Sequence, residues 1–296
     1  MSYSGDGPPQ GFRINLRWIG AVVIAVIAVT TYMMRTEVNP VTGKKQHIAM
    51  SVDQEKALGL QAAPEMASKM GGALDPERSP AARLVEEVGR RIVERSDARR
   101  SPYVGNYHFY LLDDPRTINA FALPGGQVFI TRGLYDKLDT EAQLAGVLGH
   151  EIGHVVNRHA AEHMAQGELG QMLALAVGVG ASDGQGRGRD AQVAAALVNQ
   201  MAQLKFSRQD ESEADGFGLM AMAQAGYDPT AMLDVMRVLK AASGGAHQPE
   251  FLATHPLPDT RIQAIKDYLD QQYPNGIPAD LSKGRLLNAA ERSGTP

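Results

Sequence analysis

A glutamate and two histidines spaced for metal chemistry lie near the middle of the chain, in the segment His150-Glu151-Ile152-Gly153-His154. In a helix, residues four apart lie about 40° apart around the axis, so both imidazoles face one point. Glu151 is offset from His150 by roughly 100°, which leaves its carboxylate beside that point. This H-E-x-x-H spacing predicts a zinc ion on His150 and His154, with Glu151 as the general base that accepts a proton from water. Taken alone, the string also fits a chance pattern on a polar helix face, so the surrounding sequence must decide.

The residues around this motif favour a helix. Thr140 and Gln143 fit a capping box, in which each side chain bonds the backbone of the other residue. Apolar residues follow at helical spacing, namely Leu144, Leu148, Ile152, Val155 and Val156. Gly149 and Gly153 each cost about 1 kcal/mol of helix propensity relative to alanine, so we expect them to form a flat ridge for close contact with another helix.

His159 and His163 repeat the four-residue spacing and compete as metal ligands. If the helix continues, His159 lies about 180° around the axis from His150 and cannot share its metal. We therefore interpret both as surface residues. The three-histidine signature H-E-x-x-H-x-x-G-x-x-H is absent, because Asn157 and Ala160 occupy its last glycine and histidine positions. The third ligand must come from another segment.

That third ligand is expected to be a carboxylate, because two histidines with a glutamate are one established zinc set. In the acid-rich segment 207–215, Glu211 and Asp215 form a pair four residues apart, on a face that is otherwise small and apolar. Such a pair would repel and lose hydration unless a cation lies beside it. We predict Glu211 as the third zinc ligand and Asp215 as the acceptor of the outer N–H of His150 or His154. The alternative is an ordinary solvated acidic face.

Four blocks of the sequence together resemble a known group of zinc metallopeptidases, which includes the HtpX-like, Oma-type and CAAX prenyl endopeptidases. The blocks, in the order of that group, are NAFALPGG at 119–126, HEIGH at 150–154, Ser207-Arg208 with Glu211, Ala214 and Asp215, and HPLP at 255–258 with Arg261 and Ile262. The resemblance covers residues 106–270. It implies a gluzincin-like endopeptidase with one zinc ion per chain, the ligands His150, His154 and Glu211, and Glu151 as the base. Because relatives with several membrane spans differ from this chain, the periplasmic single-domain branch is the more similar one.

The late block adds two candidates, His255 and Arg261. Hydrolysis of a peptide bond needs a donor for the oxyanion, and either side chain could serve. His255 has two further interpretations. It is either an ordinary turn residue before Pro256, or a fourth zinc ligand that displaces water and keeps the enzyme inactive until substrate arrives.

The composition fits one catalytic domain. With 296 residues, 44% of them hydrophobic, the chain can bury one large core. The net charge of −4 gives no signal for nucleic-acid binding. There is no cysteine, which excludes disulfides, and the sequence leaves the oligomeric state open.

Residues 18–34 are 17 uncharged, mostly apolar positions between Arg17 and Arg35. We interpret them as one transmembrane anchor at the short end of the usual length, with a cleaved signal peptide as the alternative. Lys and Arg lie on both sides, so the charge rule gives no orientation. The resemblance and the signal-like N-terminus imply a single-pass protein of the bacterial inner membrane with a periplasmic catalytic domain, or a soluble periplasmic protein if the signal is cleaved.

The expected fold is α+β and mainly helical, with a small β-sheet beside the motif helix. Helical patterns run over about 53–70 and 80–96, and strand patterns over 107–112 and 127–131. We expect the strand at 127–131 to offer its edge to an extended peptide. The expected boundaries are a tail at 1–17, the anchor at 18–34, a linker at 35–51, a zinc metallopeptidase domain at 52–272 and a C-terminal tail at 273–296.

The expected function is a zinc endopeptidase for misfolded or misassembled envelope proteins, a substrate class that the resemblance implies. Its partners would be unfolded or extended protein segments, and the membrane through the N-terminal helix. One alternative is a membrane-tethered chaperone or assembly factor with a largely structural zinc site, and another is a zinc hydrolase of non-peptide amides or esters. Glu151 separates the first two, because a structural zinc site has no use for a base.

Overall fold

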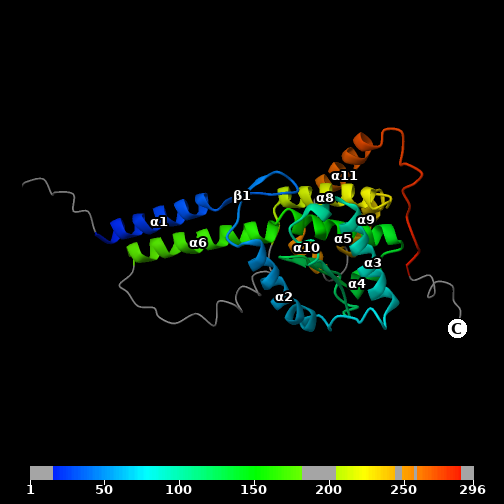
Figure 1. The fold of residues 1–296 in the computed structure, drawn as a ribbon, viewed down its shortest axis with the longest axis horizontal. Coiled ribbons are helices and arrows are strands. Elements are labelled where there is room, and N and C mark those ends of the chain that lie inside the picture. The colour runs from blue at the N-terminus through cyan, green and yellow to red at the C-terminus, as the bar shows by residue number, and fades with distance from the viewer. Residues whose placement is uncertain (1–15, 182–204, 244–248, 257–258, 288–296) are drawn as a thin grey trace, which may run out of the picture.

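The computed structural model describes residues 16–181, 205–243, 249–256 and 259–287. Helices dominate this part of the chain and two small sheets accompany them (Figure 1), so the expected α+β, mainly helical class is confirmed. In chain order the elements are α1 (Leu16–Met34), β1 (Thr36–Val38), β2 (Lys45–His47), α2 (Val52–Lys69), α3 (Pro80–Arg95), the 3-10 helix η1 (Asp97–Arg100), β3 (His108–Leu112), β4 (Ala120–Leu123), β5 (Gln127–Thr131), α4 (Arg132–Tyr135), α5 (Glu141–Val156), α6 (His159–Ala181), α8 (Arg208–Gln224), α9 (Ala231–Ser243), α10 (Glu250–Thr254) and α11 (Asp259–Gln272).

The larger sheet has three strands in the order β3-β5-β4. β5 runs parallel to β3 and antiparallel to β4, with Phe129 opposite both Tyr110 and Phe121. Every residue of β5 is buried, because it is the central strand. The expectation that strand 127–131 offers its edge to a peptide is therefore wrong. The edge strands of this sheet are β3 and β4. The sequence gives little sign of β4, because only four residues lie between Asn119 and the Pro124-Gly125-Gly126 turn.

The motif helix α5 packs closely on α8, as its two glycines predict. A Cβ atom at Gly153 would lie 2.8 Å from the carbonyl oxygen of Ala214, and one at Gly149 would lie 3.3 Å from that of Gly218. Both helices begin with a capping box, at Thr140 for α5 and Ser207 for α8. All side chains of α5 are buried, so this helix is the centre of the hydrophobic core.

The N-terminal helix α1 lies beside α6, and the pair extends away from the rest of the domain (Figure 1). Among the described side chains of α1, Ala21 and Ala28 are buried. Within the described part of the chain, no helix is both long and apolar enough to cross a membrane, so the transmembrane anchor expected at 18–34 is not supported.

The segment expected as a linker, 35–51, contains an ordered hairpin of β1 and β2. Its buried side chains hold the end of α5: Asn39 Nδ2 donates to the carbonyl of Val156 at 2.7 Å, and Gln46 Nε2 donates to that of Asn157. The turn residues Pro40 and Gly43 suit a linker and a hairpin equally well. The hydrogen bonds from Asn39 and Gln46 to the end of α5 show that this segment forms a packed hairpin.

Part of the expected C-terminal tail, 273–296, also packs on the domain. Leu287 is buried, Leu286 forms an isolated bridge with Thr140, and Arg285 Nε donates to Glu141 Oε2 at 3.0 Å. These contacts hold the first turn of α5. The folded unit therefore includes residues on both sides of the expected domain at 52–272.

Candidate metal centre

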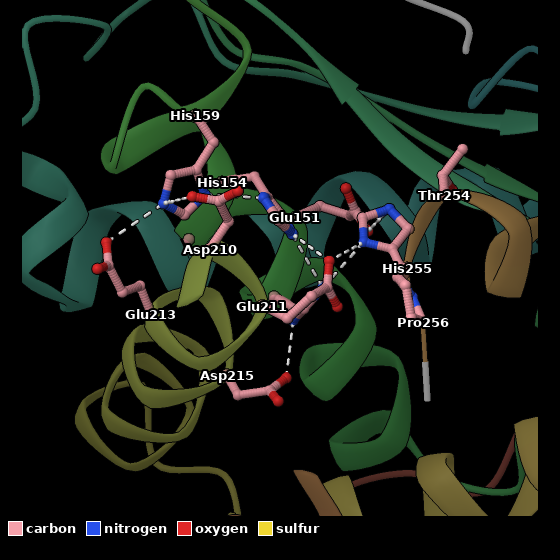
Figure 2. Close-up of polar contacts among 12 residues, drawn as sticks. Glu151, His154, His159, Asp210, Glu211, Glu213, Asp215, Thr254, His255 and Pro256 are labelled. Atoms are coloured by element: carbon pink, nitrogen blue, oxygen red, sulfur yellow. Dashed lines mark hydrogen bonds and ion pairs between the residues drawn. The ribbon is translucent and has the colours of Figure 1, made fainter. Parts of the chain in front are cut away.

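Four helices bring the candidate residues together. α5 carries His150, Glu151 and His154, α8 carries Glu211 and Asp215, His255 directly follows α10, and α11 carries Arg261. Figure 2 shows Glu211 between His154 and His255. The small residues at the α5–α8 contact allow the two backbones to approach, which places the α8 carboxylates against the α5 imidazoles. The small residues that allow α5 and α8 to pack closely therefore also bring the side chains of the site together.

Four side chains converge on one point. A ligand atom from each of His150, His154, Glu211 and His255 lies within 4.8 Å of the others, and all four residues are buried. His154 Nε2 is 3.1 Å from His150 Nε2 and 3.5 Å from Glu211 Oε1. Buried lone pairs that converge in this way are costly unless a cation lies among them, so the donor set fits a metal ion such as zinc. Among the described residues, it is the one group with this arrangement.

Asp215 and Arg261 lie behind the ligands. His150 Nδ1, which faces away from the cluster, is 2.9 Å from Asp215 Oδ1. Arg261 donates from Nε and Nη2 to the two oxygens of Asp215 at 2.8 Å, and its Nη1 pairs with Glu211. Asp215 thus lies where the sequence predicts it, beside a ligand imidazole. Arg261 is buried and engaged by carboxylates, so the oxyanion role expected for it does not fit this geometry.

Glu151 differs from every other carboxylate of the site. Both of its oxygens are buried, and neither has a hydrogen-bond partner among the residues that the structure describes. His255 Nε2 is 3.9 Å from Glu151 Oε1, beyond hydrogen-bond distance. Burial raises the pKa of Glu151 above its usual value. An unpaired buried carboxylate with a raised pKa fits a general base that takes its proton from a water molecule.

The electrostatic surroundings favour the metal-binding forms of Glu211 and His154, which are the deprotonated carboxylate and the neutral imidazole. Burial alone would raise the pKa of Glu211, but His255, His154 and His150 hold it well below its usual value. Burial lowers the pKa of His154 well below its usual value. For His150, burial opposes the charged form, yet Asp215 raises the pKa overall. A deprotonated glutamate and neutral imidazoles are the forms that bind zinc.

His159 is not the surface residue that the sequence predicts. Its side chain is 1% exposed, and its Nδ1 lies 2.9 Å from Nδ1 of His154. The prediction assumed a continuous helix, but α5 ends before Arg158, which has a left-handed backbone conformation with φ of 57°. The chain turns there, and His159 faces the metal ligands. His163 is half-buried and pairs with Asp210 at 2.8 Å.

Two aromatic side chains that the sequence did not indicate cover the imidazoles. Phe206 lies over His154 with ring centroids 4.0 Å apart, and Phe251 stacks on His255 at 4.5 Å. The sequence offers only their position as a signal, because Phe206 precedes the cap of α8 and Phe251 lies one helical turn before His255.

A donor set of two histidines and one glutamate, beside an unpaired glutamate of the H-E-x-x-H motif, defines the centre of a zinc metallopeptidase. The profile of peptidase family M48 matches residues 80–269. A beta-barrel assembly-enhancing protease of Yersinia pestis is 30% identical over 272 residues, which cover 87% of this chain and 54% of the relative. The mitochondrial metalloendopeptidase OMA1 of Schizosaccharomyces pombe is 33% identical over 258 residues, which cover 87% of this chain and 73% of the relative.

The chain belongs to peptidase family M48. The matched region contains all candidate ligands and the candidate base, so the expected class, a metallopeptidase with one zinc ion, is confirmed. The chain spans little more than half the length of the bacterial relative, at 54%.

Proposed function

We propose that this protein is a zinc endopeptidase that cleaves unfolded or extended segments of cell-envelope proteins. The observation that carries the proposal is Glu151, whose two buried oxygens have no hydrogen-bond partner in the described part of the chain and lie beside a cluster of metal ligands. Such a group is costly to bury and has a use only if a water molecule and a substrate come to it. The substrate class is supported by the relatives, one of which is named for enhancing β-barrel assembly.

The proposed reaction assigns a task to each side chain. When bound, zinc supplies a Lewis acid that polarises a peptide carbonyl and makes water more acidic. Glu151 accepts the proton of the attacking water and transfers it to the amine that leaves. Because burial raises the pKa of Glu151, the protonated form between these two transfers is favoured. Asp215 and Arg261 hold His150 and Glu211 in their orientations.

The function is tested by metal removal and return. Treating the protein with a chelator should abolish cleavage of unfolded casein, and adding back one equivalent of zinc should restore it. The helices are held by the hydrophobic core, so the helix content should persist without the metal. Cleavage that continues at the same rate in fully zinc-free protein would contradict the proposal.

A substrate strand is proposed to pair with β4. Thr131 N donates to Asn119 O at 3.0 Å, and hydrogen-bonded pairs alternate along an antiparallel ladder. The N–H and C=O of Phe121 therefore face Phe129 on β5, whereas those of Ala122 face outward. Within the described part of the chain these outward groups of Ala122 bond no other segment, so they can bond an extended peptide, which gives affinity with little sequence demand.

Replacing Ala122 with proline tests this edge. Proline removes one outward N–H and leaves the bonds between β4 and β5 intact, so we expect at least about a tenfold loss of casein cleavage. Zinc content and melting temperature should stay unchanged. Ala122→Ser, which keeps the N–H, is the matched control and should cleave like the wild type. Normal turnover of Ala122→Pro would exclude strand addition at this residue.

His255 is proposed to close the site in the absence of substrate. Its Nδ1 is 2.8 Å from Glu211 Oε1 and 3.4 Å from His150 Nε2, which places it among the predicted ligands. A fourth protein ligand takes the position that a catalytic zinc keeps for water. His255 must therefore leave before Glu151 can act.

His255→Ala is expected to raise basal casein cleavage several-fold, because the alanine cannot block the position of the water. Initial rates at equal zinc content are the measurement. A fall of about 10²-fold would instead show that His255 stabilises the transition state, and the closing role would be wrong.

We also propose that the protein binds a membrane surface through α1. The exposed apolar side chains of α1 include Trp18, Ile19, Val22, Val23, Val26 and Ile27. Apolar side chains exposed on a helix can be buried at the boundary between the headgroups and the acyl chains of a bilayer. The chain should float with lipid vesicles in a density gradient, and the double variant Val22→Glu/Val26→Glu should sediment. Equal flotation of the two would rule out lipid binding through α1.

A chaperone or assembly factor with a structural zinc site is the second candidate. The observation in its favour is that four side chains, and not three, converge on the metal position. Structural zinc sites are usually closed by a fourth protein ligand. The unpaired Glu151 favours the peptidase, because a closed structural site gains nothing from it.

A further inference from the structure

We propose that His159 is a positioning residue that fixes the tautomer and orientation of His154, and that Glu213 holds His159 in this role. The proposal rests on the zinc site of the proposed peptidase. It starts from the contact of 2.9 Å between Nδ1 of His159 and Nδ1 of His154, two buried rings that meet at the edge of the metal centre (Figure 2).

The direction of this hydrogen bond follows from the nitrogen that His154 presents to the metal. His154 Nε2 faces the cluster, 3.1 Å from His150 Nε2 and 3.5 Å from Glu211 Oε1. A neutral imidazole with a free lone pair on Nε2 carries its proton on Nδ1. His154 Nδ1–H therefore donates to His159. In the reverse arrangement His154 would be protonated on Nε2 and could not bind the metal.

His159 is in turn held by α8. Because its Nδ1 accepts, neutral His159 carries its proton on Nε2, which is 3.3 Å from Glu213 Oε2 and 3.8 Å from Asp210 Oδ1. Glu213 also pairs with Lys44 in the turn between β1 and β2. A hydrogen-bonded chain therefore runs from Glu213 through His159 to His154, and the N-terminal hairpin ties down its far end.

The two ligand histidines are supported in different ways. His150 contacts a carboxylate directly, with 2.9 Å between its Nδ1 and Asp215 Oδ1. For His154 the carboxylate on α8 is that of Glu213, and the ring of His159 lies between the two side chains. Outer partners of this kind orient the ligand and raise its basicity. Glu213, on the side of α8 away from Glu211, gains a function that the zinc ligands alone do not explain.

A strained turn directs His159 to His154. The left-handed backbone conformation of Arg158 is unfavourable for a residue with a side chain. The Arg158 guanidinium offsets this cost, because its Nε donates to Glu55 Oε1 at 3.0 Å and its Nη2 donates to the carbonyl of Met50 at 3.2 Å. Arg158 and Glu55 are both buried. The fold thus keeps the turn that makes the His159–His154 contact possible.

A second metal site at His159, His163, Asp210 and Glu213 is the competing interpretation of these side chains. Among the described residues, only the cluster at His150 meets the distances required of a metal site. A metal on His159 would also leave its 2.9 Å contact with His154 unexplained. The positioning role explains the contact between His159 and His154, and it needs no second metal cluster among the described residues.

The test compares zinc affinity, measured by competition with a chelator, in the wild type and in His159→Phe. Phenylalanine keeps the ring but cannot accept the hydrogen bond, so zinc affinity should fall about 10- to 100-fold. His159→Asn should retain most of the affinity, because its Oδ1 can accept the same bond. His163→Phe is the matched control: His163 pairs with Asp210 and should change affinity less than about twofold.

The melting temperature is the second measurement, made with and without zinc. A positioning role predicts that His159→Phe loses part of the rise in melting temperature that zinc causes, while zinc-free proteins melt alike. Wild-type zinc affinity in His159→Phe would overturn the proposal, as would equal losses in His159→Phe and His163→Phe, or in His159→Phe and His159→Asn. A wild type that binds no zinc would instead refute the proposed function itself.

Discussion

Replacing Glu151 with glutamine is expected to reduce casein cleavage by about 10³-fold and to leave the zinc content unchanged. Glutamine has almost the same shape as glutamate but cannot accept a proton from water. The ligands His150, His154 and Glu211 do not depend on Glu151 for any hydrogen bond, since neither of its oxygens has a hydrogen-bond partner among the described residues. The loss should therefore appear in kcat and not in metal binding.

Initial rates and zinc content, measured on the same samples, check this prediction. Glu94→Gln is a suitable control, because Glu94 is an exposed carboxylate on α3 and should have no effect. A Glu151→Gln variant that retained zinc and cleaved casein at the wild-type rate would show that Glu151 is not the base. A variant without zinc would show that Glu151 supports the metal site in a way that the unpaired oxygens do not suggest.

Replacing Arg261 with leucine is expected to destabilise the zinc-free protein by about 3–5 kcal/mol. Arg261 is 5% exposed and pairs with both Asp215 and Glu211, which would be left as two buried negative charges. A bound zinc ion supplies positive charge at the same place. The destabilisation should therefore be smaller in the zinc-loaded protein.

Urea unfolding of the zinc-free and zinc-loaded forms measures this difference. Arg237→Leu provides the comparison, because Arg237 forms an exposed pair with Asp234 that should contribute less than about 1 kcal/mol. If Arg261→Leu cost no more than Arg237→Leu, the buried charge cluster would not need its cation. The supporting role of Arg261 would then be wrong.

The chemistry of the site was predictable from sequence because its main determinants are local. The spacing of His150, Glu151 and His154 on one helix, and of Glu211 and Asp215 on another, places each group on a defined face. Gly149 and Gly153 likewise indicated that a second helix would pack closely, and Ala214 and Gly218 provide that contact. The faces of a regular helix can be predicted from its own sequence, without information about the rest of the chain.

The errors have non-local causes. The exposure of His159 was misjudged because the turn at Arg158 depends on Glu55, more than one hundred positions away in the sequence. The edge of the sheet was assigned to β5 because strand order depends on the pairing of β4, a strand of only four residues. The hairpin at 36–47 bonds to the end of α5, which no local pattern in that segment indicates. In each case a distant contact decides between structures that the local sequence permits equally.

The position of the zinc ion decides whether these residues form the metal centre. Anomalous scattering from crystals of the zinc-loaded chain, measured on both sides of the zinc absorption edge, locates the metal without any assumption about activity. We expect one peak per chain, between Nε2 of His150, Nε2 of His154 and the carboxylate of Glu211. No peak at that point, or a peak held by His159 and His163 instead, would contradict this expectation.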